Sequence, residues 1–450
     1  MPGDAPDAMS HSDKTIYALA SGGLPCAVAL IRISGSDVQE WSERHLAKGL
    51  PSPRQAVLSQ ILDHDLKTVD EAIVTFFPGP YSYTGEDVLE VGIHGGKAVV
   101  DHVFALLSSH RNCRLAGPGE FTRRAFEAGR IDLTRAEGIA DLIAAETRGQ
   151  KDLALAQAGG ALADLYNGWR ASLMKVLSLL EASIDFPDEA EAPTQILKPV
   201  GEALEGLMRA FETALRDGEI DQRIRDGFRV AIVGPPNAGK STLLNYFAKR
   251  DAAIVTERPG TTRDVIEVRA TLAGHVVYFL DTAGLRETDE PIEAEGIRRA
   301  HAAAGDADLR LHLFADGPSP PPLTDWREGD LAIRTKADLG LKEGLTGNAL
   351  AISVLEASGM DALEKALAKW VSDKTANRGS PVLTRIRHRE AILAAKSEIG
   401  EALTGLADAR GHELVAENCR MAARHVASLV GGIDVEDVLG EVFSSFCIGK

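Results

Sequence analysis

A glycine-rich octapeptide constrains the fold of this chain more than any other feature. Residues 234–241 read Gly-Pro-Pro-Asn-Ala-Gly-Lys-Ser, directly after a buried-strand pattern at 228–233 and before a helical segment at 240–250. The pattern G-x-x-x-x-G-K-[ST] between a strand and a helix is typical of a loop that surrounds nucleotide phosphates with backbone N–H groups. We therefore predict a P-loop α/β domain, in which Lys240 contacts the outer phosphates and Ser241 binds Mg²⁺.

Two further motifs follow in the order expected for a GTPase-type nucleotide switch. Gly-Thr-Thr-Arg-Asp occupies 260–264, and Asp-Thr-Ala-Gly occupies 281–284 after a predicted strand at 275–280. We expect Thr262 to complete the Mg²⁺ shell and to sense the γ-phosphate. Asp281 is placed to hold the metal through water, and the Gly284 N–H to meet the γ-phosphate.

The base-reading motif departs from the usual Asn-Lys-x-Asp, because this chain has Thr335-Lys-Ala-Asp338. Asp338 can accept two hydrogen bonds from guanine, which adenine cannot supply. Thr335 cannot reproduce the Asn amide, at a cost of about 1 kcal/mol per missing neutral bond. The loop at 352–355, which contains Ser353, also departs from the usual Ser-Ala. We expect GTP to be preferred over ATP.

The hydrolytic group is less clear from spacing. Leu285 follows the Asp-Thr-Ala-Gly motif, where a Ras-like enzyme places the Gln that orients the attacking water, and Leu cannot do so. Acidic side chains follow in the same segment, at Glu287, Asp289, Glu290 and Glu293. Spacing alone does not choose among them.

Patterns outside the P-loop region predict a multidomain protein with α/β and α+β parts. Strand-like runs at 27–33 and 72–77, with a helical segment at 98–107, indicate an N-terminal α+β module. Amphipathic helices are predicted over 121–146, 150–185 and 199–217, and again after about residue 385. The predicted domains are an α+β module at 1–120, helical segments at 121–220 and 379–450, and an inserted P-loop G domain at 221–378.

Composition excludes several classes of protein. The chain has 450 residues, and 49 Lys and Arg against 66 Asp and Glu give a net charge of −17, so any nucleic-acid contact needs a local basic patch. No run approaches the roughly 18 apolar residues of a membrane helix, and no apolar signal segment is visible. The four cysteines lack zinc-ligand and disulfide-framework spacing. We expect a cytoplasmic protein with no membrane segment.

Several longer motifs carry a resemblance that covers nearly the whole chain. They are Tyr-Thr-Gly-Glu-Asp-Val-Leu-Glu at 83–90, His-Gly-Gly at 94–96, Gly-Pro-Gly-Glu-Phe-Thr-Arg-Arg-Ala-Phe at 117–126, Ile-Asp-Phe-Pro-Asp at 184–188 and the ending Phe-Cys-Ile-Gly-Lys at 446–450. With the G-domain motifs, they make the chain resemble the MnmE, or TrmE, family of tRNA-modification GTPases.

The resemblance implies an N-terminal folate-binding module that dimerises, a discontinuous helical domain and an inserted G domain. It also implies a flavin-dependent partner, MnmG, with which the family installs an aminomethyl or carboxymethylaminomethyl group on the wobble uridine of tRNA. GTP hydrolysis, driven by pairing of two G domains, is needed for that reaction. A reduced folate (formyl- or methylene-tetrahydrofolate) supplies the one-carbon unit.

By the same resemblance, the folate-contacting positions are Arg32, Glu90, Arg130 and Lys450. A cation there can pair with the glutamate carboxylate of the folate, and Glu90 can accept from its pterin ring. Without the family, Arg32 is more simply a cross-strand ion-pair partner and Glu90 a solvated strand carboxylate.

The resemblance also assigns the hydrolytic machinery. Asn237, Thr256, Arg258 and Thr261 belong to the parts that bind K⁺, which would lie against the phosphates where other GTPases place an arginine. Glu293 matches the family's catalytic glutamate, which positions the attacking water. Motifs and resemblance together assign nucleotide contacts to Gly234, Asn237, Ala238, Gly239, Lys240, Ser241, Thr242, Thr256, Glu257, Arg258, Pro259, Gly260, Thr261, Thr262, Asp281, Thr282, Ala283, Gly284, Thr335, Lys336, Asp338 and Ser353.

Three alternatives stay open. Cys447 is either a reactive thiol near the modification site or, as a weaker interpretation, part of a C-a-a-X sequence that Gly449 and Lys450 fit poorly. The whole chain could instead be a ribosome-assembly GTPase that shares this architecture. It could also be a nucleotide-switched binding scaffold with negligible hydrolysis, which Thr335 and Leu285 would favour.

Overall fold

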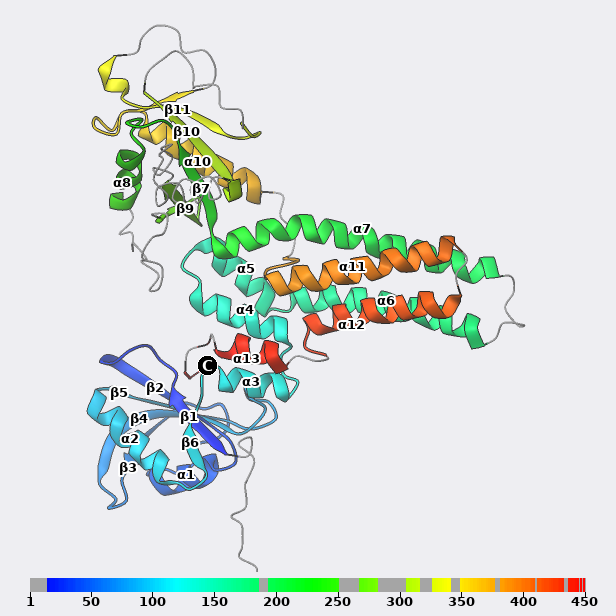
Figure 1. Cartoon of the computed structure of the whole chain (residues 1–450). Coiled ribbons are helices and arrows are strands. Elements are labelled where there is room, and N and C mark those ends of the chain that lie inside the picture. Colours follow the sequence, from blue (N-terminus) through cyan, green and yellow to red (C-terminus); the bar gives the residue numbers. More distant parts are fainter. Residues whose placement is uncertain are drawn as a thin grey trace, which may run out of the picture. The chain divides into compact units, whose positions relative to one another are not determined.

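The computed structural model describes most of the chain (Figure 1). The described residues are 14–185, 193–250, 267–281, 305–315, 326–340, 349–376, 381–408, 411–432, 436–444, 446, 448 and 449. The chain forms two compact units. The first comprises Met1–Ala140, Ala158–Met174 and Arg420–Lys450, and the second comprises Asp141–Gln157 and Lys175–Cys419.

The first unit contains a six-stranded sheet in the order β3-β4-β5-β2-β1-β6. Its strands are β1 Thr15–Leu19, β2 Cys26–Ser34, β3 Val57–Leu62, β4 Thr68–Phe77, β5 Val88–Gly95 and β6 Cys113–Leu115, and two helices accompany it, α1 Val38–His45 and α2 Lys97–Ser109. All pairings are antiparallel except β1 with β6.

Alternation along β2 explains which face of this sheet is covered. Ala29, Ile31 and Ile33 are fully buried and pack in one cluster with Trp41 of α1 and Val103 of α2. The intervening residues of β2 lie on the opposite face, as the period of two requires. The predicted α+β module is confirmed, with the expected strands and helix inside β2, β4 and α2.

Further helices of this unit are α3 Glu120–Glu127 and α13 Glu436–Ser444, together with parts of α4 Leu133–Ala144, α6 Ala161–Asp185 and α12 His412–Leu429. Leu133 and Ala136 of α4 are buried against Val442 and Phe443 of α13. Helical segments from before and after the α/β segment therefore pack together, as predicted.

The predicted long helices are interrupted, and glycines explain why. The segment 121–146 is α3 followed by α4, and Gly129 between them has φ +66°. The segment 150–185 is α5 Arg148–Ala158 followed by α6, with Gly160 at φ +102°. A Cβ at Gly160 would lie 2.3 Å from the Arg135 guanidinium. A backbone in the left-handed region ends a helix, and glycine tolerates it.

Two long helices dominate the helical part of the second unit. They are α7 Pro193–Asp226, longer than the predicted 199–217, and α11 Ile386–Ala407, and they lie side by side in Figure 1. Lys396 pairs with Glu212 at 3.0 Å, and Arg389 pairs with Glu219 at 3.2 Å. These helices come from before and after the α/β segment, so the α/β domain is an insertion, as expected.

The inserted domain has a sheet in the order β12-β11-β10-β7-β9-β8. Its elements are β7 Phe228–Val233, α8 Lys240–Arg250, β8 Glu267–Leu272, β9 His275–Asp281, β10 Leu309–Phe314, β11 Leu331–Arg334, the 3₁₀ turn η2 Ala337–Leu339, β12 Leu350–Ala351 and α10 Met360–Thr375.

All strand pairings in this sheet are parallel except that of β8 with β9, which confirms the predicted α/β sheet. β8 was not expected from the sequence patterns, and it pairs antiparallel with β9 through the turn Ala273–Gly274. Within the described part of the chain, no helix is long and apolar enough to cross a membrane.

Candidate functional site: a P-loop nucleotide site

The predicted phosphate loop leaves β7 and enters α8, as the motif requires. Gly234 follows β7, and a Cβ there would lie 2.3 Å from the carbonyl oxygen of Leu313 in β10. Further along, Asn237 has φ +63° and Gly239 has φ +87°. The loop therefore curves tightly against a neighbouring strand, the geometry that turns successive N–H groups toward an anion.

Lys240 spans this loop. Its Nζ donates to the carbonyl oxygens of Gly234 at 2.7 Å and Pro235 at 3.0 Å, and its side chain is buried. The ammonium is thus held inside the curve of the loop, where a phosphate can take up its donors. Ser241 and Thr242 begin α8 with exposed side chains, and the Ser241 hydroxyl is available to a hydrated Mg²⁺.

Thr335 attaches the base-reading loop to the phosphate loop. Its hydroxyl donates to the Ala238 carbonyl oxygen at 2.8 Å, and its N–H donates to the Phe314 carbonyl oxygen at 2.9 Å. The side chain is only 4% exposed. The Thr in place of Asn therefore makes a buried contact of its own, which sequence analysis did not foresee.

The two predicted base-side loops lie next to each other. Lys336 has φ +56°, Asp338 is exposed in η2, and the Ala337 N–H donates to the Ile352 carbonyl oxygen at 3.1 Å. Ser353 is buried, and its hydroxyl accepts from the Glu356 N–H at 3.3 Å. Both loops follow the carboxyl ends of parallel strands, the edge where α/β sheets bind ligands.

Asp281 ends β9 at the same edge. Its backbone is in register with Ile232 of β7, two residues before the phosphate loop begins. The other predicted switch, potassium and catalytic positions lie outside the described residues. They are Thr256, Glu257, Arg258, Pro259, Gly260, Thr261, Thr262, Thr282, Ala283, Gly284 and Glu293.

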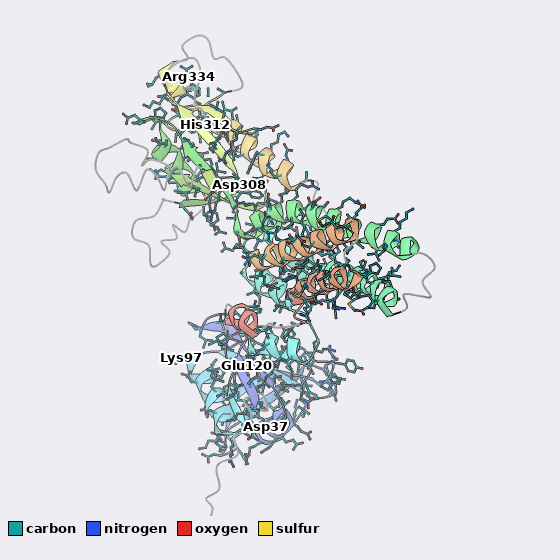
Figure 2. All side chains as sticks on the ribbon, turned by 45° about the vertical axis from the view of Figure 1, so that its right-hand side comes forward. Asp37, Lys97, Glu120, Asp308, His312 and Arg334 are labelled. Carbon is teal, nitrogen blue, oxygen red and sulfur yellow. The ribbon has the colours of Figure 1, made fainter. Side chains whose placement is uncertain are left out.

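A buried polar cluster that the sequence patterns did not predict surrounds His312 of β10, which is labelled in Figure 2. Asp330 accepts from Arg310 Nε at 3.0 Å and from His312 Nε2 at 2.9 Å, and Trp326 stacks on His312 with ring centroids 4.1 Å apart. Burial lowers the pKa of His312. Burial acts to raise the pKa of Asp330, but hydrogen bonds from Arg310 and from the Arg327 N–H lower it overall. In the sequence, Arg310 and His312 interrupt the otherwise apolar strand 309–314, and these two polar residues could have indicated the cluster.

Two of the predicted folate positions meet in the first unit. Arg32 of β2 and Glu90 of β5 are cross-strand neighbours, and Arg32 donates to Glu90 Oε1 from Nε at 3.0 Å and from Nη2 at 2.8 Å. Their side chains are 16% and 25% exposed. The Arg32 guanidinium lies over the rings of Tyr83 at 5.5 Å and Phe121 at 5.7 Å. Arg32 and Glu90 therefore form the cross-strand ion pair that was expected without the family resemblance. The pair is half-buried and lies next to two aromatic rings.

The other folate positions are not joined to this pair. Arg130 is exposed, and among the described residues no hydrogen bond or ion pair links it to Arg32 or Glu90. Lys450 and Cys447 lie outside the described residues. Their neighbour Ile448 forms an isolated bridge with Pro118, so Ile448 lies beside the loop before α3.

A charged cleft of about 780 Å³ lies next to that loop, between α3, α13 and residues 84–86. Arg124 donates to both carboxylate oxygens of Glu86, at 3.0 and 2.9 Å. Arg114 pairs with Glu120, labelled in Figure 2. Although burial opposes it, hydrogen bonds from Arg114 and the Gly117 N–H lower the pKa of Glu120. These arginines are therefore neutralised within the cleft.

The sheet order, the loop that Lys240 spans and the adjoining Thr-Lys-Ala-Asp loop define the inserted domain as a P-loop nucleotide-binding domain of the GTPase type. Residues 133–447 match the family described as "MnmE helical domain", and residues 15–130 match "GTP-binding protein TrmE N-terminus". The chain belongs to the MnmE family of tRNA modification GTPases, which confirms the family predicted from its motifs.

Individual relatives agree with this assignment. The chain is 52% identical to the tRNA modification GTPase MnmE of Hyphomonas neptunium, over 97% of this chain and 99% of that protein. It is 46% identical to the MnmE of Parvibaculum lavamentivorans, over 97% of this chain and 100% of that protein. The MnmE of Caulobacter vibrioides is also 46% identical, over 97% of this chain and 99% of that protein.

Proposed function

We propose that this chain hydrolyses GTP and couples that hydrolysis to modification of the tRNA wobble uridine. The observation that carries the proposal is the direct bond between the two loops that read the nucleotide. Thr335, three residues before the proposed base-binding Asp338, donates to the Ala238 carbonyl oxygen in the phosphate loop. The loops proposed to bind the base and the phosphates are therefore joined directly. Membership of the tRNA modification GTPase family supplies the RNA side of the proposal.

We assign the nucleotide roles from the sequence motifs, which the geometry of the phosphate loop supports. Lys240 neutralises the outer phosphates, Ser241 and Thr262 bind Mg²⁺, and Asp281 holds the metal through water. Asp338 accepts from the guanine N1 and N2 donors. The remaining nucleotide contacts are those assigned to the phosphate loop, to 256–262, to 281–284, and to Lys336 and Ser353.

For hydrolysis we propose K⁺ and Glu293. A K⁺ bound by Asn237, Thr256, Arg258 and Thr261 supplies the positive charge that a Ras-like enzyme receives from an arginine. The left-handed backbone of Asn237 in the phosphate loop is compatible with a ligand position there. Glu293 positions the attacking water in place of Leu285 when two G domains pair. Its substitution by Ala should lower kcat sharply and leave nucleotide affinity unchanged.

For the one-carbon chemistry we propose a reduced folate at the N-terminal module of a homodimer. Arg32, Arg130 and Lys450 supply cations for its carboxylates, and Glu90 accepts from its pterin. The half-buried Tyr83 ring beside Arg32 offers apolar contact to a planar ring, and the buried Phe121 supports Arg32 from below. Cys447 would then lie near the modification site as a reactive thiol.

The partners in this proposal are tRNA and the flavin-dependent MnmG, in the cytoplasm. The chain has a net charge of −17, so the basic surface that binds tRNA would be a local patch of this chain or a surface of MnmG. The proposed domains remain 1–120, 121–220 with 379–450, and 221–378.

Mass spectrometry of tRNA nucleosides tests this function. Cells that lack the chain should lose the modified wobble uridine, and the intact gene should restore it whereas Lys240→Ala should not. An unchanged nucleoside profile together with accumulated ribosomal precursors would favour the ribosome-assembly alternative. Full restoration by Glu293→Ala, which should keep nucleotide affinity, would favour the scaffold alternative, in which hydrolysis is dispensable.

A further inference from the structure

The turn between β8 and β9 contacts helix α5, which precedes the inserted domain by many residues. The Gly149 N–H in the first turn of α5 donates to the carbonyl oxygen of Gly274 at 2.9 Å. A Cβ at Gly149 would lie 2.3 Å from the imidazole of His275. Since a real Cβ does not approach a ring that closely, a side chain at position 149 would displace the His275 ring from the turn.

Two further contacts join the same elements. Glu146, just before α5, forms an ion pair with Arg269 of β8. Leu153 of α5 is 3% exposed and belongs to the apolar core of the G domain, with Ile224, Phe228 and Val277. The α5 segment is therefore built into the G domain through a backbone bond, an ion pair and a buried side chain.

The position of this turn in the chain gives the contact its meaning. β8 begins five residues after Thr262, the predicted Mg²⁺ and γ-phosphate ligand, and β9 ends at Asp281, the predicted metal ligand. The two strands pair from Glu267 with Leu280 to Leu272 with His275. Paired strands tend to move together. A shift of the turn between β8 and β9 should therefore move the opposite ends of both strands, which adjoin the predicted nucleotide ligands.

We propose that Gly149 and Glu146 are positioning residues for GTP hydrolysis, which act through the β8–β9 pair on Thr262 and Asp281. The inference rests on the proposed GTPase activity. The phosphate loop and the base-side loops do not belong to this strand pair. Disturbing the contact should therefore lower the rate of hydrolysis and spare the affinity for GDP, which those loops bind.

The test uses the full-length chain with Gly149→Ala. Its kcat should fall at least about fivefold, the lower end of common coupling between sites, with GDP affinity unchanged within about twofold. Gly206→Ala is the matched control, because Gly206 lies inside α7 and a Cβ there meets nothing within 4 Å. That control should keep both parameters.

A charge exchange keeps the test open if Gly149→Ala does not fold. Glu146→Arg should lower kcat, and the double variant Glu146→Arg with Arg269→Glu should recover it, because the exchanged pair restores the attraction. Asp308→Asn supplies a second control. Asp308 accepts from Arg223 of α7 at 2.7 Å and from the Arg229 N–H of β7 at 2.8 Å, so its substitution disturbs an attachment of the G domain that involves neither β8 nor β9.

The outcomes separate two failures. A wild-type chain that neither binds nor hydrolyses GTP refutes the proposed function itself. An active wild type whose kcat is unaffected by Gly149→Ala and Glu146→Arg, in folded variants, overturns the positioning role alone. Equal losses of kcat and GDP affinity in Gly149→Ala and Asp308→Asn would also overturn it, since they would reflect a general loosening of the domain.

Discussion

The two six-stranded sheets of this protein present their predicted ligand positions in different ways. In the G domain they lie on loops at the carboxyl ends of parallel strands, where backbone groups do much of the binding. In the N-terminal sheet, Arg32 and Glu90 are side chains on the face of antiparallel strands, 58 residues apart in sequence. The first kind of site is encoded in a contiguous motif, whereas the second depends on strand register.

The largest effect should follow from Lys240→Ala, because this ammonium lies inside the phosphate loop. We expect GTP hydrolysis to fall by at least about 100-fold, as for other losses of a transition-state charge partner. Reduced-folate binding should not change, since it uses the other sheet. Lys249→Ala, exposed near the other end of α8, is the control and should retain activity. Parallel turnover and folate-binding assays would separate the two sheets, and a shared loss would contradict their independence.

A smaller effect is expected from Thr335→Val, which has a similar shape but no donor. The buried Ala238 carbonyl oxygen would lose its 2.8 Å bond, at a cost of about 1–3 kcal/mol. We expect GDP affinity to weaken about tenfold, measured by titration of a fluorescent nucleotide. Thr335→Ser keeps the hydroxyl and should bind like the wild type. Equal affinity of the Val and Ser variants would show that the loop-to-loop bond does not matter.

In the N-terminal sheet, Glu90→Gln should weaken reduced-folate binding about fivefold, because an amide accepts less strongly than a carboxylate. The free energy of unfolding should change by less than about 1 kcal/mol, since partly exposed ion pairs contribute little. Calorimetric titration and urea unfolding measure the two quantities. Unchanged folate affinity with a large loss of stability would make the Arg32–Glu90 pair structural only.

The smallest effect concerns two buried histidines of the N-terminal module. His45 Nδ1 lies 2.9 Å from the Leu62 carbonyl oxygen, so Nδ1 carries the proton and Nε2 accepts from His110 Nε2 at 3.1 Å. A further proton on this pair would place an N–H donor on both of the facing Nε2 atoms, which removes the hydrogen bond between them. Burial is the main cause of the lowered pKa of both rings; Arg44 and His64 lower it further, and nearby Glu40 and Asp37 oppose the shift at His110.

The sign follows from this shift. Unfolded histidine takes up protons near pH 6.5 and the folded pair does not, so stability is complete above about pH 6.5 and falls as the pH drops below it. His110→Gln keeps a donor and does not titrate, so its unfolding midpoint should depend less on pH between 6.5 and 5. If the urea midpoints of the wild type and of His110→Gln changed with pH in the same way, the assigned tautomers would be contradicted.

What the sequence predicted reflects the range of the interactions involved. The strand at 228–233, the phosphate loop and α8 were predicted correctly because their signals are contiguous. The breaks at Gly129 and Gly160 were missed because apolar periodicity continues through them. The Thr335–Ala238 bond, the Asp330 cluster and the His45–His110 pair were missed because they join distant segments, whose register a single sequence does not reveal.

The central claim is that two G domains, paired around a monovalent cation, hydrolyse GTP. The direct measurement is GTP turnover by the full-length chain in KCl and in NaCl at equal ionic strength. We expect turnover to be more than about tenfold faster in KCl and to rise with protein concentration, since the proposed K⁺ supplies the charge that an arginine supplies in other GTPases. Equal rates in the two salts, independent of protein concentration, would contradict it.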